Sequence, residues 1–328
     1  MKHLPTQNSA VAQILLAWYD QQGRSLPWRG LRNPYAIWLS EIILQQTRVE
    51  QGLPYWQRFL RELPTLDDLA RAEPEVVKGL WSGLGYYRRA DLLHRAAKHL
   101  VEHGWPSGYE MWRGVPGVGP YTAGALASIL DGEPVPALDG NAYRVYARLS
   151  DWRSPIDSAA SKAFIAEFAG ARMPAQRPGD FNQAIMDLAQ ALCVPRKPRC
   201  PSCPISDFCL ARQNGSAEGL PTKVRNPKVR AESWHFAVAH KDGQFGLVQR
   251  PASGIWSGLF APVQLDSAPN GLEPEVVTHR LSHRALTLNI YRVSEEFADF
   301  THWMTPEEWR SRGMPQAFVH WMAKFTYI

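Results

Sequence analysis

Residues 115–125 read VPGVGPYTAGA, and this stretch decides how the chain around it folds. Gly117 and Gly119 allow a tight turn with positive φ and close approach by another molecule. Small residues follow Tyr121, so we expect a hairpin turn that leads into a helix. The N–H groups of a turn at the start of a helix can bind a phosphate, although many such turns are only turns.

Helical patterns surround the hairpin as far as about residue 213. Apolar residues recur at helical spacing in eight segments: Val11–Gln21, Asn33–Leu44, Leu53–Leu63, Thr65–Ala72, Glu73–Trp81, Ala90–His103, Tyr121–Leu130 and Asp180–Leu192. After Leu220 a basic, proline-bearing segment, PTKVRNPKVRAE, is a plausible linker. Strand-like runs follow (SWHFAVAH, GQFGLVQR and ALTLNIYRV), and a last helix is expected in residues 305–325. The pattern predicts a mostly α-helical domain followed by a small α+β domain.

The composition of the 328 residues is that of an ordinary globular protein, with 45% hydrophobic and 20% charged residues. No apolar run reaches the roughly 18 residues needed to span a membrane, and the N-terminus lacks an export signal, so a cytoplasmic protein is expected. Residues 1–225 carry 26 Lys and Arg against 21 Asp and Glu, whereas residues 226–328 carry 10 of each. This excess suits an anionic partner such as nucleic acid, although a slightly basic surface without such a partner is the simpler alternative.

All four cysteines lie within seventeen residues, at Cys193, Cys200, Cys203 and Cys209. The spacing C-x6-C-x2-C-x5-C contains no histidine and only one C-x2-C pair, whereas a structural zinc site usually has two such pairs. Four thiolates on one loop-rich segment favour an iron–sulfur cluster over zinc, with unligated buried cysteines as a third alternative.

Two carboxylates stand out on either side of the hairpin. Asp139 precedes Gly140-Asn141 in LDGNAYRV, where an isolated Asp-Gly would usually be an Asx turn or a helix cap. Glu41 is the second residue of SEIILQQTRVEQ (residues 40–51), and on a helix Glu41, Gln45 and Arg48 share one face. A lone glutamate on a helix is usually solvated surface.

Several separate motifs resemble the endonuclease III-like DNA glycosylases, which have a helix-hairpin-helix fold and a [4Fe-4S] cluster. The cysteine spacing matches theirs, and VPGVGPYTAGA is similar to their LPGVGxxTA. SExxLQQTxV, LPWR at 26–29, GLGYYRRA at 83–90 and FNQAIMDLA at 181–189 resemble one branch, the MutY family of adenine DNA glycosylases. The resemblance covers roughly residues 11–213 and implies a [4Fe-4S] cluster on the four cysteines.

This resemblance implies roles for the residues that match. Glu41 would be the acid that protonates N7 of adenine and later activates water, and Asp139, with Asn141 beside it, would stabilise the oxocarbenium ion or bond to it transiently. The bifunctional relatives carry a lysine at the position of Tyr121, so a phenol there implies base removal without an efficient lyase step. The adenine would be flipped out of the duplex into a pocket lined by Trp28, Arg29 and Gln183.

DNA contacts follow from the same resemblance. The backbone at Gly117 and Gly119 would hold a phosphate, and Gln46 and Tyr86 would wedge into the duplex beside the opposing base. The other expected DNA-binding residues are Gln45 and the basic loop residues Arg196, Lys197 and Arg199. Without the resemblance, Tyr86 is a core aromatic and VPRKPR is a solvated basic loop.

The last hundred residues resemble the Nudix-like domain with which this family recognises 8-oxoguanine. RPASGIWSGLFAPV and HRLSHRALTLNIY carry the likeness, which implies that Leu281, Ser282 and His283 recognise the damaged base. Leu281 stands where phenylalanine is usual, and Phe260 where tryptophan is frequent. The Nudix hydrolase motif is absent, so we do not expect nucleotide hydrolysis.

Together these observations predict three parts: a catalytic region over residues 1–220, a linker over 221–231 and a Nudix-like domain over 232–328. The catalytic region would comprise a six-helix module over about 26–136, and an iron–sulfur module formed by the N-terminal helix with residues 137–220. The expected protein is a cytoplasmic, bacterial-type, nucleoid-associated monomer that hydrolyses adenine from double-stranded DNA at mispairs with 8-oxoguanine or G. A thymine or damaged-pyrimidine glycosylase and a non-catalytic iron–sulfur DNA-binding protein are the alternatives.

Overall fold

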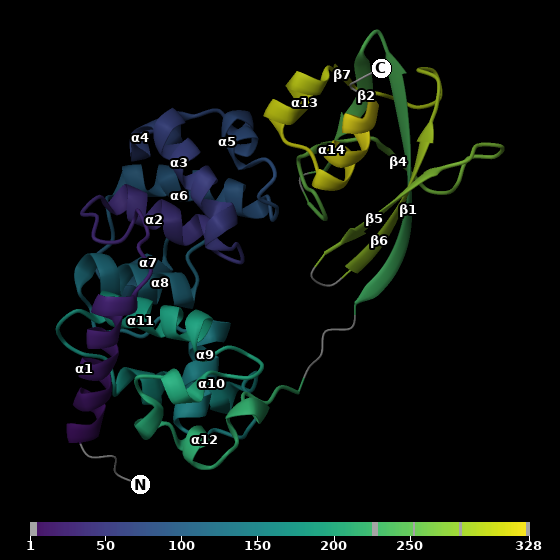
Figure 1. Cartoon of the computed structure of the whole chain (residues 1–328). Helices are drawn as coiled ribbons and strands as arrows, with labels where there is room; N and C mark the ends of the chain where they lie inside the picture. Colours follow the sequence, from purple (N-terminus) through teal and green to yellow (C-terminus); the bar gives the residue numbers. More distant parts are fainter. Residues whose placement is uncertain (1–4, 225–228, 252, 282–283, 326–328) are drawn as a thin grey trace. The chain divides into compact units, whose positions relative to one another are not determined.

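The computed structural model describes residues 5–224, 229–251, 253–281 and 284–325 (Figure 1). The chain forms two compact units, which we call the hairpin unit (residues 1–45 and 102–226) and the sheet unit (residues 46–101 and 227–328). No helix in the described ranges is long and apolar enough to cross a membrane.

In the described residues of the hairpin unit, every regular element is a helix. Its helices are α1 (Pro5–Gln22), α2 (Pro34–Ile43), α7 (Tyr109–Arg113), α8 (Pro120–Leu126), α9 (Gly140–Leu149), α10 (Ala159–Gly170), α11 (Pro178–Ala191) and α12 (Leu210–Gln213). A π-helical turn (Ala127–Asp131) continues α8, and short 3-10 turns occupy Cys200–Ser202, Ser206–Phe208 and Ala217–Gly219. Helices α1, α9, α10 and α11 enclose a core in which Leu15, Tyr146, Ile165 and Phe181 are fully buried.

Helix α2 carries Glu41 and is enclosed by protein on most of its surface. Asn33 caps its first turn by accepting a hydrogen bond from the N–H of Ala36 at 3.2 Å. Trp38 and Leu39 have no exposed surface, so the helix runs through the interior and keeps water away from the carboxylate that it bears. This position explains how a single glutamate on a helix becomes something other than solvated surface.

The described residues of the sheet unit form α-helices and a mixed β-sheet. The helices of residues 46–101 are α3 (Val49–Glu62), α4 (Leu66–Arg71), α5 (Pro74–Trp81) and α6 (Arg88–His103). The C-terminal elements are β1 (Arg230–Lys241), β2 (Gln244–Gln249), β3 (Phe260–Ala261), β4 (Val263–Leu265), β5 (Glu275–Arg280), β6 (Arg284–Arg292), β7 (His302–Met304), α13 (Pro306–Arg312), α14 (Gln316–Met322) and a 3-10 turn (Ala323–Phe325).

The strand order is β3-β2-β1-β6-β5, with β4 paired to β1 and β7 paired to β2. Strands β1 and β6 run parallel, from Arg230 opposite Arg284 to Val238 opposite Arg292, and the other pairs are antiparallel. Apolar side chains from the sheet pack against α13 and α14, and the core includes Phe236, Leu288, Trp309 and Phe318. The predicted fold class, a helical region followed by a smaller α+β domain, is confirmed.

Two local expectations need correction, and two helices were not expected. The helix expected over 121–130 is α-helical only to Leu126 and then widens into the π-helical turn. The single last helix expected over 305–325 is interrupted between α13 and α14, where Gly313 adopts φ +90° and Pro315 follows. Helices α9 and α10, which Asp139 and Ser158 cap, were not among the helices expected from the sequence.

Candidate active site

The hairpin of residues 114–119 joins α7 to α8, as its sequence predicts. Gly117 has φ +79°, a backbone conformation that favours glycine over residues with a Cβ. Gly119 is the N-cap of α8 with φ −86°, so the positive φ that its sequence allows is not used. A Cβ at Gly119 would meet nothing within 4 Å, so the backbone here is open to an approaching molecule.

Glu41 of α2 and Tyr121 of α8 meet inside the hairpin unit. The Tyr121 hydroxyl donates a hydrogen bond to Oε2 of Glu41 at 3.4 Å. Removal from water raises the pKa of Glu41 to about 7, and the charge of Asp139 adds to the rise. The Tyr121 hydrogen bond and the Arg29 guanidinium oppose it. Glu41 can therefore hold a proton near neutral pH and release it there.

Asp139 is held rigidly at the N-cap of α9. Its Oδ1 accepts the backbone N–H groups of Asn141 and Ala142, each at 2.8 Å, and its Oδ2 accepts the Asn141 side-chain amide at 2.7 Å. The helix-cap interpretation is therefore correct, and it is compatible with a site role because Asp139 also acts electrostatically on Glu41. The cap fixes the orientation of a carboxylate whose charge acts on the Glu41 carboxyl.

The segment that precedes Asp139 is clamped by a residue that the sequence analysis missed. Asn182 is 4% exposed, and its Oδ1 accepts the N–H of Ala137 at 3.0 Å. Its amide nitrogen donates to the carbonyl of Val135 and to the hydroxyl of Ser128, each at 2.9 Å. The only sequence signal was its place in FNQAIMDLA, directly before Gln183.

Of the three expected adenine-pocket residues, Trp28 and Arg29 are neighbours in the turn that precedes α2, and Gln183 lies on α11. Trp28 is buried, and Gln183 on α11 accepts a hydrogen bond from the Tyr19 hydroxyl at 3.1 Å. Arg29 acts electrostatically on Glu41. These contacts place Arg29 near the acid and give Gln183 a fixed partner.

Arg29 is anchored by an aspartate that the sequence analysis did not identify. Its guanidinium donates to both carboxylate oxygens of Asp187, at 2.7 and 2.9 Å, and Arg24 donates to the same carboxylate at 2.7 Å. Although burial pushes the pKa of Asp187 upward, the bonds from Arg29 and Arg24 hold it below its usual value. Asp187 lies one helical turn after Gln183, a spacing that could have revealed it.

Helix α9 also connects the Asp139 cap to the cysteine loop. Arg144 donates to Oδ1 of Asn141 at 3.2 Å, to the carbonyl of Cys193 at 2.8 Å and to that of Ala189 at 2.9 Å. One turn later, the buried Arg148 donates to the carbonyls of residues 194, 195 and 220 and to Sγ of Cys193 at 3.3 Å. Two arginines on one helix thus shape the start of the cysteine loop.

The four cysteines fit an iron–sulfur cluster. All are partly buried, and each of the other three acts electrostatically on Cys203. Burial raises the pKa of Cys203 to about 12, so a thiolate there needs a compensating positive centre. Four thiolates on one loop are the donor set by which proteins hold iron–sulfur clusters.

The expected DNA-contact residues are exposed or strained. Arg196, Lys197 and Arg199 are all exposed on the loop between the first two cysteines. In the sheet unit, Gln46 has φ +58° and Tyr86 has φ +49°, conformations that are uncommon outside glycine and cluster at functional sites. Tyr86 is 52% exposed, which contradicts the core-aromatic alternative.

Gln45, which was expected to bind DNA, makes hydrogen bonds within the protein. Its side-chain amide donates to the hydroxyl of Thr122 at 3.0 Å and to the carbonyl of Gly117 at 3.4 Å. It thus ties the end of α2 to the hairpin turn.

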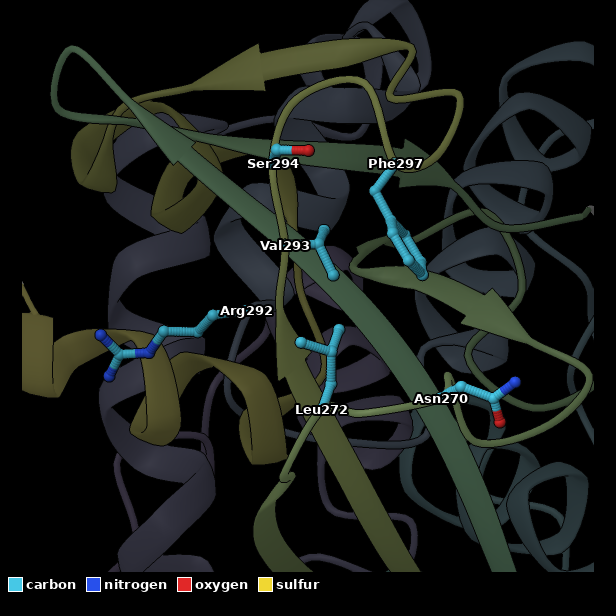
Figure 2. Close-up of a pocket in the computed structure, with 6 residues that line it drawn as sticks. All are labelled: Asn270, Leu272, Arg292, Val293, Ser294 and Phe297. Carbon is cyan, nitrogen blue, oxygen red and sulfur yellow. The ribbon is translucent and has the colours of Figure 1, made fainter.

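In the C-terminal domain, Leu281 packs against the domain core and its N–H donates to the carbonyl of Arg284 at 2.8 Å. Ser282 and His283 lie outside the described residues. A hollow of about 460 Å³ opens elsewhere in this domain, and Figure 2 shows the side chains around it, which belong to Asn270, Leu272, Arg292, Val293, Ser294 and Phe297. It contains none of the expected site residues.

Known protein families match three stretches of the chain. Residues 39–167 match the HhH-GPD superfamily of base excision DNA repair proteins, residues 193–209 the iron–sulfur binding domain of endonuclease III, and residues 235–324 the NUDIX domain. The match at 193–209 ends at the first and last cysteines and identifies the loop as an iron–sulfur site.

Relatives and solved structures agree with these matches. An adenine DNA glycosylase of Rattus norvegicus is 32% identical over 94% of this chain and 76% of its own length. One of Arabidopsis thaliana is 38% identical over 75% of this chain, and the match spans 46% of the plant protein. The structure of a thermostable thymine-DNA glycosylase shares the fold, with a TM-score of 0.58 at 24% identity over 64% of this chain and 98% of its own.

Proposed function

Because the chain belongs to the family of adenine DNA glycosylases, we propose that it hydrolyses the N-glycosidic bond of adenine mispaired with 8-oxoguanine or G. The observation that carries this proposal is a carboxyl group, Glu41, with a pKa raised to about 7 beside a second carboxylate, Asp139. Two carboxyl groups in different surroundings can divide acid catalysis and charge stabilisation between them.

Glu41 supplies the proton. Adenine leaves poorly as an anion, so its N7 takes the Glu41 proton as the bond between C1′ and N9 breaks and the bonding electrons move onto the base. A water molecule then attacks C1′, and its proton returns to the Glu41 carboxylate. The products are free adenine and an abasic sugar, and the acid is restored.

Asp139 stabilises the positive charge that develops on the sugar. Three N–H donors hold its carboxylate in one orientation, so no reorganisation is needed as the charge appears. Asn141 belongs to this support because its side chain binds Asp139 on one side and Arg144 on the other.

Tyr121 keeps the reaction at base removal. Burial first, and then the nearby carboxylates Glu41 and Asp139, raise the pKa of its phenol well above the usual value. The hydroxyl therefore stays protonated and donates to Glu41. A phenol has no amine with which to form a Schiff base, so strand cleavage by that route does not occur.

The extruded adenine would be received by Trp28, Gln183 and Arg29. The guanidinium of Arg29 is anchored on Asp187, so it acts chiefly through its fixed positive charge near Glu41. Gln183 presents an amide whose orientation is set by Tyr19. These fixed partners preorganise the pocket before the base arrives.

DNA would be held through its phosphates and its stacked bases. The open backbone at Gly119 and the exposed basic loop at 196–199 suit phosphates, and the exposed Tyr86 together with Gln46 suits the gap beside the opposing base. Residues 1–220 would thus perform excision, and residues 232–328, joined by 221–231, would recognise 8-oxoguanine through Leu281, Ser282 and His283.

The cluster site has a structural place in this proposal. Cys193, Cys200, Cys203 and Cys209 would hold a [4Fe-4S] cluster, which when bound cross-links the loop that carries the basic residues. One chain supplies both carboxylates and the phenol, so a monomer suffices.

A panel of duplexes tests the proposed function. The purified chain is incubated with 8-oxoguanine:A, G:A and T:G duplexes, and alkali-labile sites are counted under single-turnover conditions. We expect sites opposite 8-oxoguanine and G and none at T:G. Cleavage of the T:G duplex with none at 8-oxoguanine:A would instead support a pyrimidine glycosylase.

A further inference from the structure

Two neighbouring tyrosines of the loop at residues 82–88, which we call the wedge loop, have opposite surroundings. Tyr86 is 52% exposed, whereas Tyr87 is only 7% exposed. The left-handed backbone of Tyr86, at φ +49°, turns consecutive side chains in different directions. The Tyr86 ring therefore reaches the surface, with the guanidinium of Arg89 5.4 Å from its centre, whereas the Tyr87 ring packs inside the protein.

The Tyr87 hydroxyl joins the wedge loop to the C-terminal domain. It donates a buried hydrogen bond to the carbonyl of Met314 at 2.9 Å. The same oxygen accepts the backbone N–H of Gly83 at 3.2 Å, at the start of the loop. Both partners are backbone groups of the sheet unit, so one hydroxyl fixes two chain segments that are distant in sequence.

Met314 belongs to the core on which the lesion-recognition segment rests. The carbonyl of the preceding residue, Gly313, accepts the N–H of Phe260 at 3.1 Å, so the segment that carries Met314 is bound to β3. Met314 and Phe260 are core residues of the C-terminal domain, and Leu281 packs against the same core. A continuous packed path therefore leads from Leu281 to the carbonyl that Tyr87 binds.

Other contacts join the wedge loop and the helix before it to the C-terminal domain. Helices α5 and α13 pack against each other. A Cβ at Gly313 would lie 3.6 Å from Cβ of Lys78, and a Cβ at Gly83 would lie 3.4 Å from Nε2 of Gln316. The wedge loop and the preceding helix thus lie directly against the segment that joins α13 to α14.

We propose that Tyr87 is a positioning residue that couples recognition of 8-oxoguanine by the C-terminal domain to insertion of Tyr86 beside the lesion. The inference rests on the proposed function. Binding of 8-oxoguanine near Leu281 favours one arrangement of the Met314 segment, and the Tyr87 hydrogen bond transmits that preference to the wedge loop. Because such coupling is reciprocal, insertion of Tyr86 also strengthens contact with the lesion.

Tyr87→Phe tests the coupling, because it removes the hydroxyl and keeps the ring. Single-turnover excision is measured for full-length wild type and variant on 8-oxoguanine:A and on G:A duplexes. Loss of one buried hydrogen bond corresponds to a rate reduction of about fivefold. We expect that reduction at 8-oxoguanine:A and little change at G:A, where the C-terminal domain has no lesion to report.

Tyr55→Phe is the matched control. The Tyr55 hydroxyl donates to the carbonyl of Ser82 at 2.9 Å, so it supports the same loop without involving the C-terminal domain. Its loss should change excision at both duplexes by the same factor. Hydrogen exchange of the free protein gives a second readout: Tyr87→Phe should speed exchange both at residues 82–88 and at 312–316, and Tyr55→Phe only at the former.

The outcomes separate this inference from the function beneath it. A wild-type chain that releases no adenine from 8-oxoguanine:A contradicts the proposed function. A wild-type chain that prefers 8-oxoguanine:A, with the same preference in Tyr87→Phe, overturns the coupling alone, and so does a variant whose rates fall equally on both duplexes.

Discussion

The phenol of Tyr121 donates a hydrogen bond to the carboxyl of Glu41 over 3.4 Å, although 80 residues separate them in the chain. The bond joins the helix that follows the hairpin to the buried helix α2. It favours the ionised form of Glu41, whereas removal from water favours the protonated form and prevails. The acid is thus balanced to exchange its proton near neutral pH.

This balance predicts how excision depends on pH. Glu41 must be protonated to deliver a proton, and its pKa is raised to about 7. The single-turnover rate should therefore fall about tenfold per pH unit well above pH 7, with an apparent pKa near that value. A rate that stays constant from pH 6 to 9 would exclude Glu41 as the acid.

Tyr121→Phe should move that pH profile in a defined direction. Removing the hydroxyl takes away a bond that lowers the pKa of Glu41, so the carboxyl should hold its proton to higher pH. The descending limb of the rate profile should shift upward by a few tenths of a unit or more. An unchanged or downward-shifted limb would show that the bond does not act on the acid.

The raised pKa of Glu41 should also make the stability of the protein depend on pH. The folded-state pKa of Glu41, about 7, lies above the ordinary 4.5, so the folded chain keeps a proton that the unfolded chain releases between these values. The free energy of unfolding should therefore fall as pH rises through this window. Glu41→Gln should be more stable than wild type at pH 8, by roughly 1–3 kcal/mol, in urea unfolding. If the difference in stability between Glu41→Gln and wild type were the same at pH 5 as at pH 8, the raised pKa of Glu41 would be contradicted.

The anchored arginine gives a prediction with an internal control. Asp187 is 2% exposed and pairs with Arg29 and Arg24, whereas Asp20 is 49% exposed and pairs with Arg177 at 2.5 Å. Removing one partner of a buried pair costs about 3–5 kcal/mol, and removing an exposed one costs less than about 1 kcal/mol.

Asp187→Asn should therefore lower the free energy of unfolding strongly, and Asp20→Asn hardly at all, when both are measured by urea unfolding at pH 7. Comparable losses in the two variants would show that the Asp187 cluster does not anchor the pocket.

The sequence predicted the parts of the fold that local patterns encode. The hairpin, the helix of Glu41 and the cysteine loop all carry short motifs with fixed spacing, and the structure has each of them. Helices α9 and α10 were not predicted from the sequence, although Asp139 and Ser158 cap them. Tertiary packing decided these elements.

The residues of the candidate site were predicted from the sequence, but their burial and their hydrogen-bond partners were not. The removal of the Glu41 carboxyl from water depends on the packing of α2, in which Trp38 and Leu39 have no exposed surface, and no sequence periodicity shows this. Asp187 and Asn182 act only through partners far away in sequence, so single-sequence patterns could not assign them. The bond from Tyr87 to Met314 spans 227 residues and was equally hidden.

The most direct test of the central claim follows free adenine. Wild type and Glu41→Gln are each mixed in excess with an 8-oxoguanine:A duplex at pH 7, and released adenine is measured by chromatography while binding is followed by fluorescence anisotropy. We predict one adenine per duplex from wild type, with the strand intact until alkali is added, and tight binding without release from Glu41→Gln. Adenine released by Glu41→Gln at the wild-type rate, or none from wild type, would contradict the account.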